Sequence, residues 1–167
     1  MAAIDIGPGA TDRSTVGSAT DLMHLAITNP ANASGKLTTF EIWCNTTCYS
    51  VKMGTFYGSS TSWTSRDHES LGTVASGSKQ TFTGLDCLVE KDDIIGSYIS
   101  SGSIEKDTTG SYEVYWKTGD WFGAGTQTYT VNSVDVYSLY GTGETVDGIP
   151  FFKEFCGGLN IDMTGGL

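Results

Sequence analysis

The chain has 167 residues, with 22 glycines and only 3 prolines, and its nineteen acidic and nine basic residues give a formal net charge of −10. This length suits one well-packed domain better than two. Nucleic acids and anionic membranes are both bound through clustered Lys and Arg, whereas the basic residues here are scattered. We therefore expect neither nucleic acid nor membrane as a partner.

The N-terminal residues 1–16 are predicted to form an extended arm. Gly7, Pro8 and Gly9 interrupt any regular element, while Ile4 and Ile6 are spaced for a short edge strand that could dock on a partner. The first thirteen residues also lack the basic start and apolar core of a secretory signal. We therefore expect synthesis in the cytoplasm, where the four cysteines stay reduced.

The stretch from Gly35 to Gly58 shows the clearest strand pattern. Phe40, Ile42 and Cys44 fall on one face of a first run, and Val51 and Met53 fall on one face of a second. Alternation with a period of two is typical of half-buried strands. The polar residues 45–48 between the two runs predict a hairpin turn.

Further strands are predicted along the rest of the chain, separated by Gly, Ser, Asn and Asp turns. They cover residues 21–28, 63–71, 80–83, 85–89, 94–100, 104–106, 112–117 and 134–140, and residues 118–125 form a glycine-rich loop. Roughly eight to ten short strands without helices favour an all-β, antiparallel, jelly-roll-like β-sandwich. We place this domain at residues 17–143.

Residues 144–167 differ in composition and are predicted to form a docking tail. Phe151, Phe152 and Phe155 crowd together, with Pro150 before them and Gly157 after them, as in a single helical turn. One turn cannot bury three phenylalanines by itself. The tail is therefore expected to dock either on its own sandwich or on another subunit.

The chain offers little support for catalysis. His24 lies on the polar face of a predicted strand, as an ordinary surface histidine would. His68 stands between Asp67 and Glu69, but neighbours on a strand point to opposite faces, so adjacency does not bring these carboxylates to the imidazole. No nucleophile elbow, HExxH or P-loop motif occurs. We predict a protein that is not an enzyme and has no catalytic residues.

No cofactor or metal is predicted. Cys44 and Cys48 have no second cysteine pair nearby, and Cys44 and Cys87 fall on apolar strand faces, where thiols act as small hydrophobes. Aspartates in loops could bind calcium, although turn formation is the simpler explanation for them. These aspartates are Asp5, Asp12, Asp92, Asp93, Asp107 and Asp120.

Three tryptophans are candidate recognition residues. Trp43 lies on the outward face of its strand, Trp63 begins another strand, and Trp121 stands in the glycine-rich loop. Exposed aromatic rings stack on sugars and also form subunit contacts, while buried ones belong to a core. The sequence leaves these three interpretations open.

Several segments together resemble a module found in structural proteins of tailed bacteriophages. They are AIDIGPGATDR (3–13), NPANASG (29–35), FEIW (40–43), VKMGTFYG (51–58), KQTFTGL (79–85) and SLYGTG (138–143). The segment LVEKDDIIGSYI (88–99) is also similar to a turn and buried strand of jelly-roll domains. The resemblance covers most of the chain before the tail and implies a virion component made in the host cytoplasm.

The resemblance implies a capsid decoration or cement protein that stabilises the viral shell through its arm and tail. Such proteins are commonly homo-oligomers, often trimers, so the expected partners are further copies of the chain and a capsid or fibre protein. The alternative is a carbohydrate-binding or receptor-binding module of a phage fibre, with a glycan as partner.

Overall fold

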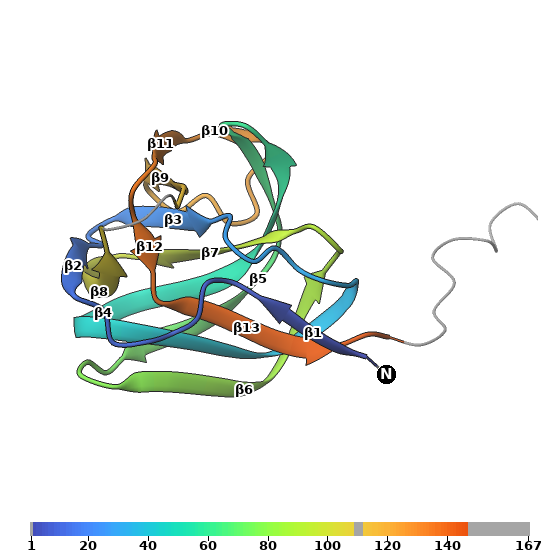
Figure 1. Ribbon diagram of the computed structural model, residues 1–167, viewed down its shortest axis with the longest axis horizontal. Helices are drawn as coiled ribbons and strands as arrows, with labels where there is room; N and C mark the ends of the chain where they lie inside the picture. Colours follow the sequence, from blue (N-terminus) through green and yellow to red (C-terminus); the bar gives the residue numbers. More distant parts are fainter. Residues whose placement is uncertain (1, 109–111, 147–167) are drawn as a thin grey trace, which may run out of the picture.

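The computed structural model describes residues 2–108 and 112–146, and within these ranges the chain forms β-strands and no helix (Figure 1). All pairing between the strands is antiparallel, so the predicted all-β antiparallel class is confirmed, whereas the jelly-roll connectivity stays a prediction. No helix suited to crossing a membrane occurs among these described residues.

The strand bounds follow the chain order. They are β1 (Ala3–Ile6), β2 (Thr15–Ser18), β3 (Leu22–Ala26), β4 (Gly35–Ser59), β5 (Ser62–Val74), β6 (Lys79–Val89), β7 (Ile94–Ile99), β8 (Ser101–Asp107), β9 (Val114–Thr118), β10 (Gln127–Thr128), β11 (Thr130–Asn132), β12 (Val136–Tyr137) and β13 (Leu139–Glu144).

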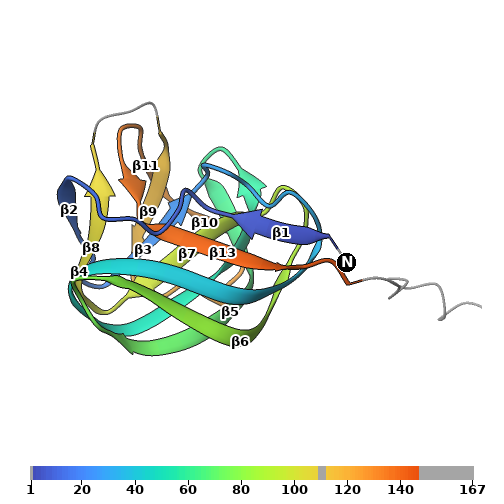
Figure 2. The same ribbon diagram turned by 60° about the horizontal axis from the view of Figure 1, so that its bottom comes forward.

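The long strand β4 joins the two layers of the sandwich. Its first part pairs with β13 and β6, its middle with β8, and its last part with β5 and β7. Figure 2 shows β4 curving across the molecule beside β6 and β13. The predicted hairpin turn at residues 45–48 is therefore wrong, because the strand continues through it.

Irregular pairing in the middle of β4 explains this error. From Phe40 to Cys48 the buried residues are even-numbered, whereas Val51 and Met53, which belong to the same apolar cluster, are odd-numbered. Between Cys48 and Val51 the register shifts, and Ser50 has a positive φ of 50°. An extra residue in one strand of a pair is a β-bulge, which bends the strand and resets which side chains face inward. The two apolar faces found in the sequence are thus one face of a single bent strand.

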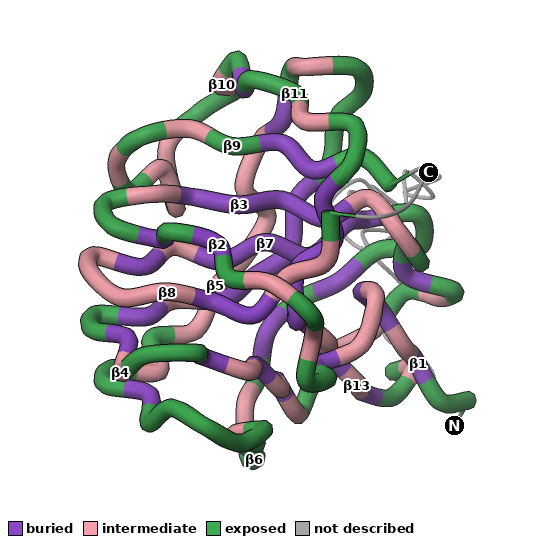
Figure 3. The backbone as a smooth tube through the Cα atoms, turned by 60° about the vertical axis from the view of Figure 1, so that its left-hand side comes forward, coloured by how far each residue is buried: buried purple, intermediate pink, exposed green. Residues whose placement is uncertain are grey.

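Two apolar clusters fill the protein, one on each side of the sheet that contains β3. Ala26 belongs to the larger cluster between the layers, whereas Met23 and Leu25 belong to a smaller one that also contains Tyr129 from the segment after β9. Alternate residues of a strand point to opposite faces, so β3 contributes to both. Figure 3 shows buried residues along β3 and β7 and exposed residues at many of the turns.

The predicted N-terminal arm needs correction because it is part of the sandwich. Strand β1 pairs with β13 from Ala3 opposite Glu144 to Ile6 opposite Gly141, and the two strands run side by side in Figure 1. Ile4 and Ile6 are only 1% and 0% exposed and lie in the larger cluster. Their side chains stabilise this chain's own core and are not available for docking on a partner.

Candidate functional site

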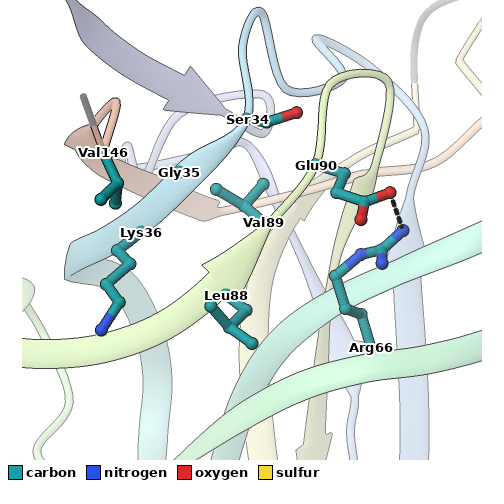
Figure 4. Close-up of a pocket in the computed structure, with 8 residues that line it drawn as sticks. All are labelled: Ser34, Gly35, Lys36, Arg66, Leu88, Val89, Glu90 and Val146. Carbon is teal, nitrogen blue, oxygen red and sulfur yellow. Dashed lines mark ion pairs between the residues drawn. The ribbon is translucent and has the colours of Figure 1, made fainter. Parts of the chain in front are cut away.

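The strand-end pocket, named for the strand ends that border it, has a volume of about 390 Å³. We define it by its lining residues Ser34, Gly35, Lys36, Arg66, Leu88, Val89, Glu90 and Val146 (Figure 4). These residues come from the start of β4, the end of β6, the middle of β5 and the segment after β13. The pocket therefore combines parts of the chain that are far apart in sequence.

Close backbone contact brings these segments together. A Cβ atom at Gly35 would lie 2.3 Å from the carbonyl oxygen of Glu144 and 2.8 Å from Ile4 Cδ1. Thr145 N–H also donates to the Ala2 carbonyl at 3.0 Å. Because glycine has no side chain, Gly35 allows the paired strands β1 and β13 to approach β4 closely.

The pocket has an apolar centre and a charged edge. Figure 4 shows Leu88 and Val89 between Val146 on one side and the Arg66–Glu90 ion pair on the other. Leu88 is 44% exposed and Val146 is 42% exposed. Exposed aliphatic side chains grouped in a concavity mark a surface suited to an apolar partner group.

The charged edge is held rigidly by ion pairs. Arg66 Nη2 lies 2.9 Å from Glu90 Oε2, and its guanidinium also contacts both carboxylate oxygens of Asp93. The same guanidinium stacks over the Tyr57 ring at 4.7 Å. Burial raises the pKa of Asp93 above its ordinary value, although hydrogen bonds from Arg66 and the Glu90 backbone oppose this shift. Arg66 is thereby fixed between the pocket and the turn before β7.

The predicted docking phenylalanines, Phe151, Phe152 and Phe155, lie outside the described residues. The described chain ends at Val146, which itself lines the strand-end pocket. Of the predicted tail, residues 144–167, Glu144 ends β13 and Val146 lines this pocket. Sequence reasoning missed the pocket because its apolar residues lie near the ends of separate strands and show no pattern of their own.

The three predicted tryptophans do not form one exposed surface. Trp63 is 7% exposed and lies in the smaller apolar cluster, where its Nε1–H donates to the Ser60 carbonyl at 3.0 Å. Trp121 is half-buried against the same cluster, and its Nε1–H donates to the Thr118 carbonyl at 2.7 Å. Trp43 is half-buried in the first part of β4.

The structure contradicts the expectation for His24 and agrees with the one for His68. His24 is 1% exposed, so the prediction of an ordinary surface histidine is wrong. His68 stacks on Phe122 with ring centroids 4.7 Å apart. The carboxylates of Asp67 and Glu69 accept from backbone N–H groups of Leu88 and Asp86, respectively, so they bridge β5 to β6. Asp67 contacts the backbone N–H of His68, not its ring.

His24 lines a second, shallow concavity of about 240 Å³. We call it the histidine recess and define it by Gly17, Ser18, Leu22, His24, Lys106, Trp116, Asn132, Asp135 and Tyr137. Burial, with a smaller contribution from the charge of Lys106, lowers the pKa of His24 to about 4. The imidazole is therefore neutral at physiological pH.

The cysteines in the described part of the chain are buried thiols, as predicted for Cys44 and Cys87. A hydrogen bond with Cys48, reinforced by burial, raises the pKa of Cys44, and burial raises that of Cys87. A raised pKa keeps a thiol protonated and poorly nucleophilic. Cys156 lies outside the described residues.

Three of the six aspartates considered for calcium are paired with basic side chains. Asp107 pairs with Arg13 at 3.1 Å, Asp120 with Lys52, and Asp93 with Arg66. Within residues 2–108 and 112–146, no group of three His, Cys, Asp or Glu side chains is arranged to hold a metal ion.

A scan against protein-family models gave no match, and a search of curated proteins gave none either.

Proposed function

We propose that this protein is a virion structural component, a capsid decoration or cement protein that assembles and attaches through its C-terminal tail. Two observations support a virion structural protein: the sequence segments that resemble a phage structural module, and the all-β antiparallel fold. The proposed attachment rests on the position of the strand-end pocket. An apolar concavity is lined by Val146, which precedes Phe151 by five residues in the sequence.

The proposed occupant of the strand-end pocket is the segment Phe151–Phe152 from a neighbouring copy of the chain. Phe151 follows Val146 by five residues, which span at most about 18 Å when extended. A copy packed against the same end of the sandwich is within this reach.

Burial of phenylalanine supplies the driving force. Each fully buried Phe side chain contributes about 1.5–3 kcal/mol. Lys36 at the pocket edge is paired with Asp86, and Arg66 is paired with Glu90 and Asp93, so carboxylates compensate the positive charges beside the apolar centre. The N-terminal strand takes no part in this attachment, because Ile4 and Ile6 are buried in the core.

Light scattering on the purified protein tests the assembly step. The full chain is compared with a chain cut after Val146 and with full-length Leu88→Lys. The cut follows Val146 because β13 pairs with β1 up to Glu144, and Thr145 bonds to Ala2. We expect a defined oligomer for the full chain and monomers for both variants.

The matched control is Val131→Lys, since Val131 is 45% exposed and lies on β11, away from the strand-end pocket. It should remain oligomeric, and circular dichroism should show the same strand content in every variant. A monomeric full chain, or an oligomer that survives removal of the tail, would contradict the proposed assembly.

The virion location needs a separate test. Antibody against the purified protein should label intact phage particles prepared from a culture that expresses the gene. Detection in the soluble lysate together with absence from the particles would exclude a virion component, whatever its oligomeric state.

A further inference from the structure

The histidine recess is built from side chains on several strands. His24 lies on β3, Lys106 on β8 and Trp116 on β9, while Asn132, Asp135 and Tyr137 come from the chain around β11 and β12. His24 and Trp116 are directly opposite one another in the β3–β9 pair, so their side chains share one face of the sheet. The recess is therefore supported by rigid strands.

Three polar groups in the recess are fixed by one another. Lys106 Nζ lies 2.9 Å from Asp135 Oδ2, and Asn132 Nδ2 donates to the same oxygen at 2.8 Å. The Asp135 side chain is only 3% exposed. Ion pairing compensates the charges of Lys106 and Asp135, which leaves a site rich in hydrogen-bonding groups without a net charge.

His24 lines this recess and also has a buried ring nitrogen without a hydrogen-bond partner in the described part of the chain. Its Nδ1 is buried and has no hydrogen-bond partner, and the same holds for Ser97 Oγ, whose residue is opposite His24 in the β3–β7 pair. A buried polar atom without a partner costs roughly 1–3 kcal/mol. A hydroxyl that contacts His24 from the recess would meet a neutral imidazole, whose ring centroid lies 4.4 Å from that of Tyr137.

Trp116 supplies a flat apolar surface beside these polar groups. It is 38% exposed, whereas Trp63 is 7% exposed and lies in a core cluster. An aromatic plane next to a few fixed polar groups complements a ligand with an apolar face and hydroxyls at its edge. Sugar rings of the pyranose type have this arrangement of C–H and O–H groups.

We propose that the histidine recess binds a neutral pyranose unit of a glycan, with Trp116 stacking on the ring and His24, Asn132 and Asp135 contacting its hydroxyls. The chain's net charge of −10 disfavours anionic sugars. The site differs from Trp43, Trp63 and Trp121, the aromatic residues that the sequence suggested. It does not depend on the tail or the strand-end pocket, so it is independent of the proposed attachment function.

The test uses the full-length protein on an array of immobilised neutral hexose and N-acetylhexosamine glycans. The strongest soluble glycan from the array is then titrated by calorimetry into the wild type, Trp116→Ala and Asn132→Ala. We expect saturable binding by the wild type and affinity at least about tenfold weaker in both variants.

Tyr49→Ala is the matched control, because Tyr49 is 50% exposed on β4 and does not line the histidine recess. It should bind with wild-type affinity, and thermal unfolding should show that all variants are folded. Absence of binding to every neutral glycan on the array would overturn the proposal. Wild-type affinity in Trp116→Ala would also overturn it, while leaving the attachment function untouched.

Discussion

Arg66 and Asp93 form a two-point ion pair that connects the edge of the strand-end pocket to the turn before β7. Arg66 Nη2 lies 3.0 Å from Asp93 Oδ1, and Arg66 Nε contacts Oδ2. The Asp93 side chain is 2% exposed, and Oδ2 also accepts from the Glu90 backbone N–H at 2.8 Å. The pair thus positions Glu90 at the pocket edge and connects β5 to the turn before β7.

Replacing Arg66 by Met should destabilise the fold strongly. The variant leaves the Asp93 carboxylate buried without its cation, and loss of one partner from a buried pair typically costs about 3–5 kcal/mol. Because Arg66 is itself 21% exposed, we expect a loss near the lower end, about 3 kcal/mol, in the free energy of unfolding measured with urea.

The control for this variant is Lys79→Met. Lys79 pairs with Glu41 at 3.0 Å, but its side chain is 44% exposed, so its removal should cost less than about 1 kcal/mol. Equal losses of unfolding free energy in the two variants would contradict the prediction, because the buried ion pair would then stabilise the fold no more than the exposed one.

The packing of β1 predicts that the N-terminal segment is needed for stability. Ile6→Ala removes a fully buried side chain next to Gly141 and Phe40, and should lower the free energy of unfolding by about 2–5 kcal/mol. Ala3→Ser, at an exposed position of the same strand, serves as the control and should change it by less than about 0.5 kcal/mol. If the N-terminal segment were a docking arm outside the core, Ile6→Ala would leave the free energy of unfolding of the isolated protein unchanged.

The buried histidine predicts loss of stability in acid. Its folded-state pKa of about 4 lies below the ordinary value of 6.5, so between these values the unfolded chain binds a proton that the folded chain does not. The stabilising effect of a neutral His24 is therefore complete above pH 6.5 and is lost as the pH falls toward 4. The full loss corresponds to roughly 3 kcal/mol.

Urea unfolding of the wild type and His24→Gln at pH 7, 5.5 and 4.5 measures this effect. Other titrating groups are common to both proteins, including Lys106, Asp135 and Tyr137, which line the recess with His24. The difference in unfolding free energy between the two proteins should shift in favour of His24→Gln as the pH falls. A difference that stays constant over this range would rule out His24 as the source.

Several elements could be predicted from the sequence because their signals are local. The alternation in the two parts of β4 indicates which side chains need burial, and the turn residues at 29–34 and 60–61 do separate strands. Burial of Cys44 and Cys87 followed from the same alternation. These properties depend on residues a few positions apart.

Other properties depend on which strands become neighbours, and only the tertiary structure decided them. The bulge in β4 replaced a hairpin because pairing with β8 supports an extended course through residues 44–49. The sequence predicted that His24 is exposed, yet its strand pairs with β7 on one side and β9 on the other. The strand-end pocket and the histidine recess unite residues from opposite ends of the chain, and no local pattern records such long-range proximity. The sequence by itself therefore determined the class of fold and the inward-facing residues of its clearest strands, whereas strand pairing determined the candidate sites.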